Sequence, residues 1–254
     1  MGRRFALIGH PVAGSLSPVL IGAAYGGRHS YDLIDEPTYA AAFQRVAAYD
    51  GFNVTAPFKK DAFRALSEIG SVIDSGGTGC INAVVRRLDG HYEAYNTDID
   101  GVVGALQEAS VVSGGLALVV GAGGAAMAAR AALHKMDFRT LIAARREEAL
   151  LAVLPEGARR GEDYFLLDDP ALRQLQPDVV VYTLPGSAPV PAGLPLSGAV
   201  VLEAEYRTPR LADCACRHYI SGRRWLLHQA VTGYRFFTGE EPDVAAMERA
   251  LSRV

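Results

Sequence analysis

The chain has 254 residues, of which 50% are hydrophobic and 21% are charged, and its formal net charge is −3. This composition is typical of a globular protein and excludes a disordered or collagen-like chain. The slightly acidic balance argues against a dedicated nucleic-acid-binding protein, which carries a strong positive excess. The apolar runs are too short for a signal peptide or a membrane-spanning helix, so we expect a cytoplasmic protein with no membrane partner.

Apolar runs that suit β-strands alternate with helix-like stretches along the whole chain. In chain order, strands are expected at residues 5–8, 31–34, 51–54, 81–85, 91–95, 116–120, 140–143, 178–182 and 199–202. Apolar residues at three- and four-residue spacing predict helices at 39–49 and 57–66, and an alanine-rich stretch predicts another at 125–136. This alternation predicts an α/β protein with mainly parallel sheets.

Two domains are expected, with a boundary near residues 98–101. From Leu116 the chain starts a new strand, glycine turn and helix, which is how a second α/β unit begins. Residues 226–254 are predicted to form two helices, because Gly239 and Pro242 are stop and restart signals. These helices can pack on either domain, and the pattern leaves that choice open.

Three cysteines, Cys80, Cys214 and Cys216, are too few for a disulfide framework. The Cys-x-Cys spacing lacks the partner pair of a zinc site. We therefore expect structural or incidental thiols and no metal.

Polar residues are concentrated at strand ends in the first hundred residues. Ser15 and Ser17 follow the first strand, although Ser17 before Pro18 also suits a helix N-cap. Thr55 follows the third strand, and Lys59 lies in the first turn of the next helix. Because the positive end of the helix dipole opposes the ammonium, Lys59 is disposed to release its proton, which suits proton transfer.

Lysine is rare in this chain, which has 22 arginines and three lysines, at positions 59, 60 and 135. Since arginine cannot give up its proton, a lysine can mark a position that needs proton exchange. Further along, Asn82 interrupts an apolar run, and a buried asparagine requires hydrogen-bond partners or a ligand. Asp98 ends the segment Asn96-Thr97-Asp98, where capping of the next helix is the alternative to binding. Together these groups suit a small polyhydroxylated ligand.

The glycine-rich turn after the strand at 116–120 suits a dinucleotide phosphate. Glycines let the backbone approach a pyrophosphate, and the following helix N-terminus offers unpaired N–H groups and a partial positive charge. A plain strand–helix turn of an α/β domain is the alternative. The turn consists of Gly121, Ala122, Gly123, Gly124 and Ala125, and Ala126 completes a G-x-G-x-x-A pattern.

The next strand predicts which dinucleotide is bound. A domain that binds NAD usually carries Asp or Glu about 20 residues after the glycine turn, to hold the ribose 2′-hydroxyl. Here the strand ends with Ala144, and Arg145 and Arg146 follow. Two guanidinium groups suit a 2′-phosphate, so the cofactor is predicted to be NADP. In a chain this rich in arginine, two solvated surface residues are the alternative.

These motifs together resemble the shikimate dehydrogenase family, in the family's order and across nearly the whole chain. The most specific matches are Asn-Val-Thr-Ala-Pro-Phe-Lys at 53–59, Tyr-Asn-Thr-Asp at 95–98 followed by Gly101, and Gly-Ala-Gly-Gly-Ala at 121–125. Supporting matches are Gly9 with Pro11, Ser15-Leu-Ser17-Pro18, Asn82, Tyr206 with Thr208-Pro209, and Gly222 with Leu226 and Gln229.

The resemblance implies an α/β fold with an N-terminal substrate-binding domain, residues 1–100 and 226–254, and a Rossmann-like doubly wound NADP-binding domain, residues 101–225. It implies an active site in the cleft between them, with Lys59 and Asp98 as the catalytic acid–base pair. The residues implied to bind the substrate are Ser15 and Ser17 for its carboxylate, Thr55, Asn82, Asp98 and Gln229 for its hydroxyls, and Tyr206 lining the cleft. Those implied to hold NADP are Gly121, Ala122, Gly123, Gly124, Ala125, Arg145, Arg146 and Gly222.

The chain departs from the family pattern mainly on the cofactor side. Ala-Arg-Arg at 144–146 replaces the Asn-Arg-Thr that is usual in the family. Tyr-Thr-Leu-Pro-Gly at 182–186 replaces the usual Asn-Ala-Thr-Ser-x-Gly. Gly14 replaces a histidine before the first serine, Glu203 stands where Asp is usual, and Arg224 accompanies Gly222. The substrate class is therefore predicted more firmly than the details of cofactor binding.

The implied function is the NADPH-dependent, reversible reduction of 3-dehydroshikimate to shikimate in aromatic amino acid biosynthesis, by a monomer or homodimer. A relative that accepts quinate or an amino analogue is an alternative, because small pocket changes decide such choices. A non-catalytic nucleotide-binding relative is another, which the retention of both Lys59 and Asp98 opposes. A folate-type dehydrogenase does not fit the Ser-x-Ser and Asn-Thr-Asp segments.

Overall fold

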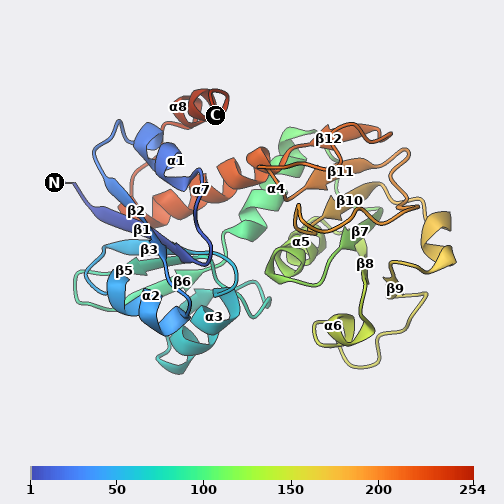
Figure 1. The fold of residues 1–254 in the computed structure, drawn as a ribbon, viewed down its shortest axis with the longest axis horizontal. Helices are drawn as coiled ribbons and strands as arrows, with labels where there is room; N and C mark the ends of the chain where they lie inside the picture. Colours follow the sequence, from blue (N-terminus) through green and yellow to red (C-terminus); the bar gives the residue numbers. More distant parts are fainter. Residues whose placement is uncertain (1) are drawn as a thin grey trace. The chain divides into compact units, whose positions relative to one another are not determined.

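The computed structural model describes residues 2–254, which form two compact units (Figure 1). The first unit extends to Gly101 and includes Leu227–Val254, and the second is Val102–Leu226. Both boundaries fall inside helices, one in α4 (Asp98–Glu108) and one in α7 (Gly222–Thr238).

A six-stranded mixed sheet forms the core of the first unit, in the order β2-β1-β3-β5-β6-β4. Its strands are β1 (Arg4–Gly9), β2 (Ser30–Asp35), β3 (Gly51–Val54), β4 (Val72–Asp74), β5 (Ala83–Arg86) and β6 (Tyr92–Tyr95). β1 runs parallel to β2 and β3, whereas β5 is antiparallel to β3 and β6. β5 and β6 are antiparallel because the connection between them, residues 87–91, is too short for the crossover that parallel strands need. It closes a hairpin, in which Arg87 N donates to His91 O at 2.8 Å.

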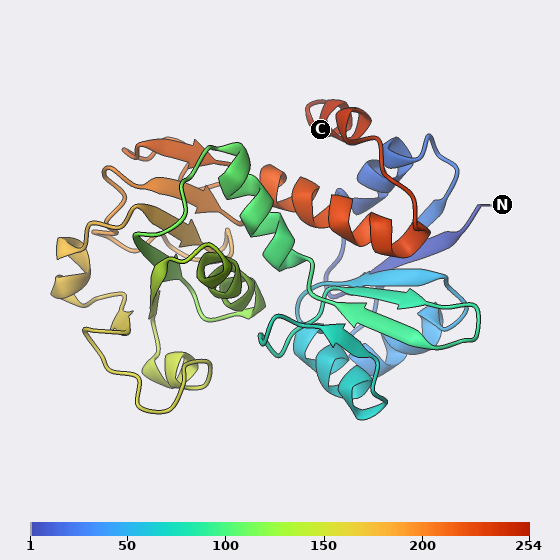
Figure 2. The ribbon, with the colours of Figure 1, turned by 180° about the vertical axis from the view of Figure 1, so that it is seen from behind.

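Helices cover both faces of this sheet. α1 (Ser17–Ala24) and α8 (Val244–Leu251) pack against each other on one side, and α2 (Tyr39–Val46) and α3 (Lys59–Glu68) lie on the other (Figures 1 and 2). Since side chains alternate along a strand, Ala6 and Ile8 of β1 join the buried cluster that contains Ala42 of α2. Phe5, on the opposite face, stacks on Phe237 of α7 with ring centroids 4.9 Å apart. Each large buried apolar side chain stabilises the fold by about 1.5–3 kcal/mol, so the strand ends are held in place.

The second unit is built on a six-stranded, fully parallel sheet in the order β12-β11-β10-β7-β8-β9. Its strands are β7 (Leu116–Val120), β8 (Arg139–Ala144), β9 (Tyr164–Leu166), β10 (Val179–Tyr182), β11 (Val200–Glu203) and β12 (His218–Ile220). Counted within the unit this is the order 6-5-4-1-2-3, which is the doubly wound order of a Rossmann fold. The order reverses between β7 and β10, where such folds bind dinucleotides.

Helix α5 (Gly124–Lys135) packs against β7, β8 and β10. Its buried face is rich in alanine, which lets the helix lie close to the sheet: Ala126, Ala128, Ala129 and Ala132. α6 (Glu147–Leu151) and the 3-10 helix η1 (Pro170–Gln174) follow β8 and β9.

The observed elements confirm an α/β fold with mainly parallel sheets, and they also correct the expected elements. β4, β9 and β12 were not predicted, because three residues are too few to show a strand period. α7 begins at Gly222, before the predicted start at residue 226, because low helix propensity makes glycine a poor start signal in the sequence. In the structure a glycine is needed there, since a Cβ on Gly222 would lie 2.5 Å from Ala204 O.

Candidate active site

Lys59 and Asp98 form an ion pair at one edge of the first unit's sheet. Lys59 begins α3 after β3, and Asp98 begins α4 after β6. Because β3 and β6 are both antiparallel to β5, their carboxyl ends lie at the same edge. Lys59 Nζ lies 2.5 Å from Asp98 Oδ2, and the two side chains are 19% and 12% exposed. The pair is partly shielded from water, which strengthens its electrostatic interaction.

Asn82 lies just before β5 and supports the Asp98 carboxylate. Its Nδ2 donates to Asp98 Oδ1 at 3.0 Å and to Gln229 Oε1 at 3.2 Å. Its Oδ1 accepts from Thr97 N at 2.7 Å and from Thr97 Oγ1 at 3.2 Å. Protein groups therefore occupy all four hydrogen-bonding positions of this amide. Asn82 orients Asp98, and a hydrogen bond to a substrate hydroxyl requires it to exchange one of these partners.

Thr97 is part of this cluster although it was not predicted as a site residue. It is fully buried, and its Oγ1 lies 3.3 Å from Gln229 Oε1. Gln229 comes from α7, far along the chain from the other members. The signal that could have identified Thr97 is its place between Asn96 and Asp98, where a strand passes into a helix with three polar residues in succession.

The two predicted serines lie side by side after β1. Ser15 Oγ donates to Ser17 Oγ at 3.2 Å and accepts from Ser17 N at 3.3 Å. Ser17 does not cap α1, because Leu16 already has helical backbone angles and takes the N-cap position without a side-chain hydrogen bond. Thr55 N donates to Ile8 O at 2.9 Å, which ties Thr55 to the carboxyl end of β1. The hydroxyl-bearing residues Ser15, Ser17 and Thr55 thus lie at the carboxyl ends of β1 and β3, where Lys59 begins α3.

The glycine turn of the second unit connects β7 to α5 at the predicted place. Gly121 has φ +126°, and a Cβ there would lie 2.2 Å from Thr183 Oγ1, so packing requires glycine. Gly123 is the N-cap of α5, which has no side-chain cap, and a Cβ on Gly123 would meet no atom within 4 Å beyond its chain neighbours. The uncapped N–H groups and the open space beside Gly123 fit a phosphate. Ala122, Gly124 and Ala125 complete this turn.

Arg145 and Arg146 follow β8, whose last residue, Ala144, is buried. Both arginines are exposed, and neither forms an ion pair within residues 2–254. They lie at the carboxyl edge of the strand beside the one that carries the glycine turn. This is where a Rossmann fold holds the adenosine ribose, so the side chains present fit a 2′-phosphate.

Tyr206 and Gly222 also belong to the second unit. Tyr206 is half-buried in the segment after β11. A Cβ on Gly222 would lie 2.5 Å from Ala204 O and 2.6 Å from Glu203 O, so this glycine has a packing reason of its own. Contact of either residue with a ligand stays a prediction.

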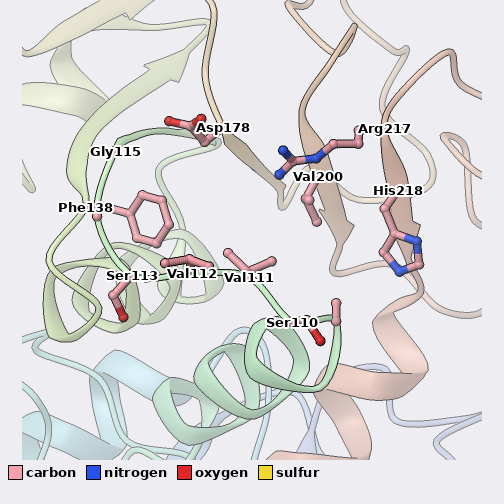
Figure 3. A pocket seen from close by; sticks show the side chains of 12 residues that line it. Ser110, Val111, Val112, Ser113, Gly115, Phe138, Asp178, Val200, Arg217 and His218 are labelled. Carbon is pink, nitrogen blue, oxygen red and sulfur yellow. The ribbon is translucent and has the colours of Figure 1, made fainter.

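A cavity of about 500 Å³ opens at the amino ends of the strands of the second sheet (Figure 3). It lies where β7, β10, β11 and β12 begin, and Phe138, Asp178, Val200, Arg217 and His218 are among the residues that line it. Parallel α/β sheets bind ligands at the carboxyl ends of their strands. This cavity is therefore separate from the predicted dinucleotide site.

Residues 2–254 offer neither a metal site nor a membrane-spanning helix. Over this range, no three His, Cys, Asp or Glu side chains are grouped so that they could hold a metal ion. None of the described helices is both long and apolar enough to span a membrane.

The fold and the site define the class of this protein: a two-unit α/β protein with a Rossmann-like dinucleotide-binding sheet in one unit and a polar cluster around a lysine–aspartate pair in the other. Known proteins share this organisation. The family model described as shikimate dehydrogenase substrate binding domain matches residues 7–84. The shikimate dehydrogenase (NADP(+)) of Rubrobacter xylanophilus is 34% identical to this chain over an alignment of 269 positions, gaps included. The alignment covers 97% of this chain and 94% of the relative. The chain therefore belongs to the shikimate dehydrogenase family.

Solved structures agree with this assignment. The shikimate 5-dehydrogenase of Thermus thermophilus, in complex with NADP(H) and shikimate, superposes with a TM-score of 0.79 at 27% identity and 99% coverage of both chains. A quinate dehydrogenase of Corynebacterium glutamicum in complex with NAD gives a TM-score of 0.80 at 22% identity, covering 100% of this chain and 99% of that one. At that identity the second likeness shows the fold alone.

Proposed function

We propose that this chain is an NADP-dependent shikimate dehydrogenase, which reversibly reduces 3-dehydroshikimate to shikimate within aromatic amino acid biosynthesis. The observation that carries the proposal is the ion pair of Lys59 and Asp98, with 2.5 Å between Nζ and Oδ2, in a chain of this family. Reduction of a ketone creates an alkoxide, and a lysine is the group in this cluster that can give it a proton.

The chemistry assigned to the pair follows from its contacts. In the reduction, the Lys59 ammonium stabilises the developing alkoxide and donates a proton to it. In the reverse direction, neutral Lys59 removes the proton from the substrate hydroxyl. Asp98 holds Lys59 through Oδ2 while Asn82 Nδ2 fixes Oδ1, so the carboxylate presents a defined edge to a substrate hydroxyl.

The remaining predicted residues supply substrate binding in this proposal. Ser15 and Ser17 offer adjacent hydroxyls to the carboxylate of the substrate, which is a compact anion. Thr55 and Gln229 hold its hydroxyls, and Tyr206 lines the site. With one carboxylate and three hydroxyls to satisfy, shikimate suits such a polar set better than an apolar substrate does.

The cofactor in this proposal is NADP, which supplies the hydride when bound as NADPH. The fit rests on the uncapped α5 N-terminus, on the open space beside Gly123, and on Arg145 and Arg146 at the end of β8. These residues would hold the pyrophosphate and the 2′-phosphate. Gly222 contributes by letting α7 begin close to the end of β11.

A substrate panel tests the proposal. The purified protein is assayed for reduction of NADP⁺ and of NAD⁺ with shikimate and with quinate, and Lys59→Ala serves as the inactive control. The expected result is highest kcat/KM for shikimate with NADP⁺. Higher kcat/KM for quinate would favour the quinate-type alternative, and no turnover with any pair while NADP⁺ still binds would favour a non-catalytic relative.

The proposal also includes action in the cytoplasm on a small-molecule substrate, by a monomer or homodimer, without nucleic acid or membrane. Light scattering after size exclusion measures the assembly. A mass above that of a dimer contradicts this part of the proposal.

A further inference from the structure

Glu203 ends β11 with a fully buried carboxylate. Its Oε1 accepts from Arg210 N at 2.7 Å. Its Oε2 accepts from Leu211 N at 3.1 Å and from Tyr219 Oη at 2.8 Å. The carboxylate therefore closes the chain between positions 203 and 211 into a loop.

A buried charge of this kind is costly unless hydrogen bonds compensate for the lost water. Within residues 2–254, Glu203 forms no ion pair, so its compensation comes from two backbone N–H groups and one phenol. Burial and the hydrogen bond to Glu203 raise the pKa of Tyr219 above its ordinary value, so this phenol remains a donor. Loss of any one donor or of the carboxylate leaves a buried polar group without a partner.

The loop that Glu203 closes, residues 204–210, contains Tyr206 and contacts a second loop. We call these segments the β11 loop (residues 204–210) and the β10 loop (residues 183–186). Arg210 Nη1 donates to Gly186 O at 2.8 Å, and a Cβ on Gly186 would lie 2.3 Å from Thr208 Oγ1. The two loops thus pack as one layer after the carboxyl ends of β10 and β11.

Gly222 adds a third contact to the same place. A Cβ there would lie 2.6 Å from Glu203 O and 2.5 Å from Ala204 O, so the start of α7 rests on the backbone of Glu203. A displacement of Glu203 would therefore also displace the β11 loop, the β10 loop and the start of α7.

The topology indicates what this layer serves. A Rossmann sheet binds a dinucleotide across its two halves. β7 and β8 carry the glycine turn and the two arginines, which suit the pyrophosphate and the adenosine 2′-phosphate. β10 and β11 belong to the other half, whose carboxyl ends receive the second nucleotide. That nucleotide carries the nicotinamide.

We propose that Glu203 is a positioning residue, which holds the β10 and β11 loops in the arrangement that orients the nicotinamide half of NADP and presents Tyr206. This inference rests on the proposed NADP-dependent function. It assigns no direct contact between Glu203 and a ligand, because the side chain is fully buried.

The test compares NADP⁺ with adenosine 2′,5′-bisphosphate, which has the adenosine half and lacks nicotinamide. Glu203→Gln preserves volume but turns an amide nitrogen toward the donors, so at least one backbone N–H loses its partner. We expect kcat/KM with NADP⁺ and shikimate to fall on the order of 10- to 100-fold, as misplacement of reacting groups does. The dissociation constant of the bisphosphate, measured by calorimetry, should be unchanged.

Two further variants complete the test. Tyr219→Phe removes one donor and keeps the carboxylate with both backbone bonds, so it should retain more activity than Glu203→Gln. Glu203→Asp keeps the charge but is too short to reach positions 210 and 211 together, and it is the deciding variant if Glu203→Gln does not fold. For Glu203→Asp, as for Glu203→Gln, we expect a lower kcat/KM with NADP⁺ and shikimate and an unchanged dissociation constant for the bisphosphate.

Two outcomes overturn the inference. One is a variant with wild-type kcat/KM and only a lower Tm, which assigns Glu203 to stability alone. The other is an equal loss of affinity for NADP⁺ and the bisphosphate, which means that the whole unit is disturbed. If the wild-type protein does not turn over shikimate, the proposed function fails, and the split between NADP⁺ and bisphosphate affinities still tests Glu203.

Discussion

Lys59 is one of three lysines in a chain of 22 arginines, and it pairs with Asp98 where two strands end. We predict that Lys59→Ala and Asp98→Asn each lower kcat on the order of 10²–10⁴-fold, because proton transfer loses its donor or its orientation. In Asp98→Asn, an amide nitrogen must face either the Lys59 ammonium or Asn82 Nδ2, so donor meets donor. Steady-state kinetics of each variant checks this prediction.

The double variant distinguishes one catalytic unit from two independent contributions. Since both groups act on the same transition state, the combined loss should be much smaller than the product of the single losses. Lys59→Arg keeps the charge without exchangeable protonation and should not restore the rate. Lys60→Ala, at an exposed neighbour, is the matched control and should keep wild-type kcat. Near wild-type turnover in Lys59→Arg contradicts the acid–base role.

At the scale of elements, the turn between β7 and α5 contains two glycines with different requirements. We predict that Gly123→Val greatly weakens NADP⁺ binding and lowers stability by about 0.5–2 kcal/mol, which is the range for N-cap substitutions. Gly123 has φ −87° and ψ −175°, which valine adopts, and the added side chain enters open space. Calorimetric binding and thermal unfolding of the variant measure the two effects.

Gly121→Ala is the contrasting control for that element. Its backbone has φ +126° and its Cβ would meet Thr183 Oγ1 at 2.2 Å, so it should destabilise the fold by about 1–3 kcal/mol. Unchanged NADP⁺ affinity in Gly123→Val shows that the phosphate binds elsewhere.

The end of β8 carries the prediction on cofactor choice. Replacing Arg145 and Arg146 together by alanine should raise the dissociation constant of NADP⁺ at least about tenfold, because hydrogen bonds to charged groups contribute about 1.5–3 kcal/mol each. NAD⁺ has no 2′-phosphate, so its affinity should change little. Arg139→Ala, an exposed arginine at the other end of β8, is the control and should leave both affinities unchanged. Equal losses for the two cofactors contradict the assignment.

At the scale of the whole molecule, we predict that His29 makes the free energy of unfolding depend on pH. Burial and the charges of Arg28 and Arg3 lower its pKa from 6.5, with Glu240 opposing them. His29 Nδ1 accepts from Arg3 N at 3.0 Å, and Nε2 is buried without a partner among the described residues. The unfolded histidine takes up a proton as pH falls through about 6.5, whereas folded His29 does so only at lower pH. The unfolded state then binds more protons, so the free energy of unfolding decreases as pH falls below about 6.5.

His29→Asn tests this dependence, because its Oδ1 can accept from Arg3 N and it does not titrate. Urea unfolding of both proteins between about pH 5 and 7.5 should give a shallower pH slope for the variant. The pKa of His134 is lowered in the same direction by burial and Arg130, but this contribution is common to both proteins. Identical slopes for the two proteins mean that His29 does not contribute.

Much of the fold follows from local pattern, because buried strands and amphipathic helices have periods that a sequence displays. The strand at residues 116–120 and the glycine turn after it were predicted where the structure has them, since each depends on neighbouring residues alone. The hairpin of β5 and β6 and the three-residue strands were not, because pairing decides them. The same holds for Ser17, whose hydroxyl was open to a capping role until the backbone placed the cap at Leu16.

By itself the sequence determined the α/β class, the dinucleotide turn, and a lysine and an aspartate that suit proton transfer, because these depend on residue type and short spacing. Only the tertiary structure decided that Lys59 and Asp98 meet, that Asp98, Gln229 and Thr97 together saturate Asn82, and that Glu203 closes a loop. These groups come from separate strands and helices. Their contacts depend on how the sheets pair and how α7 returns to the first unit, and the long-range burial that drives such pairing leaves no local trace in the chain.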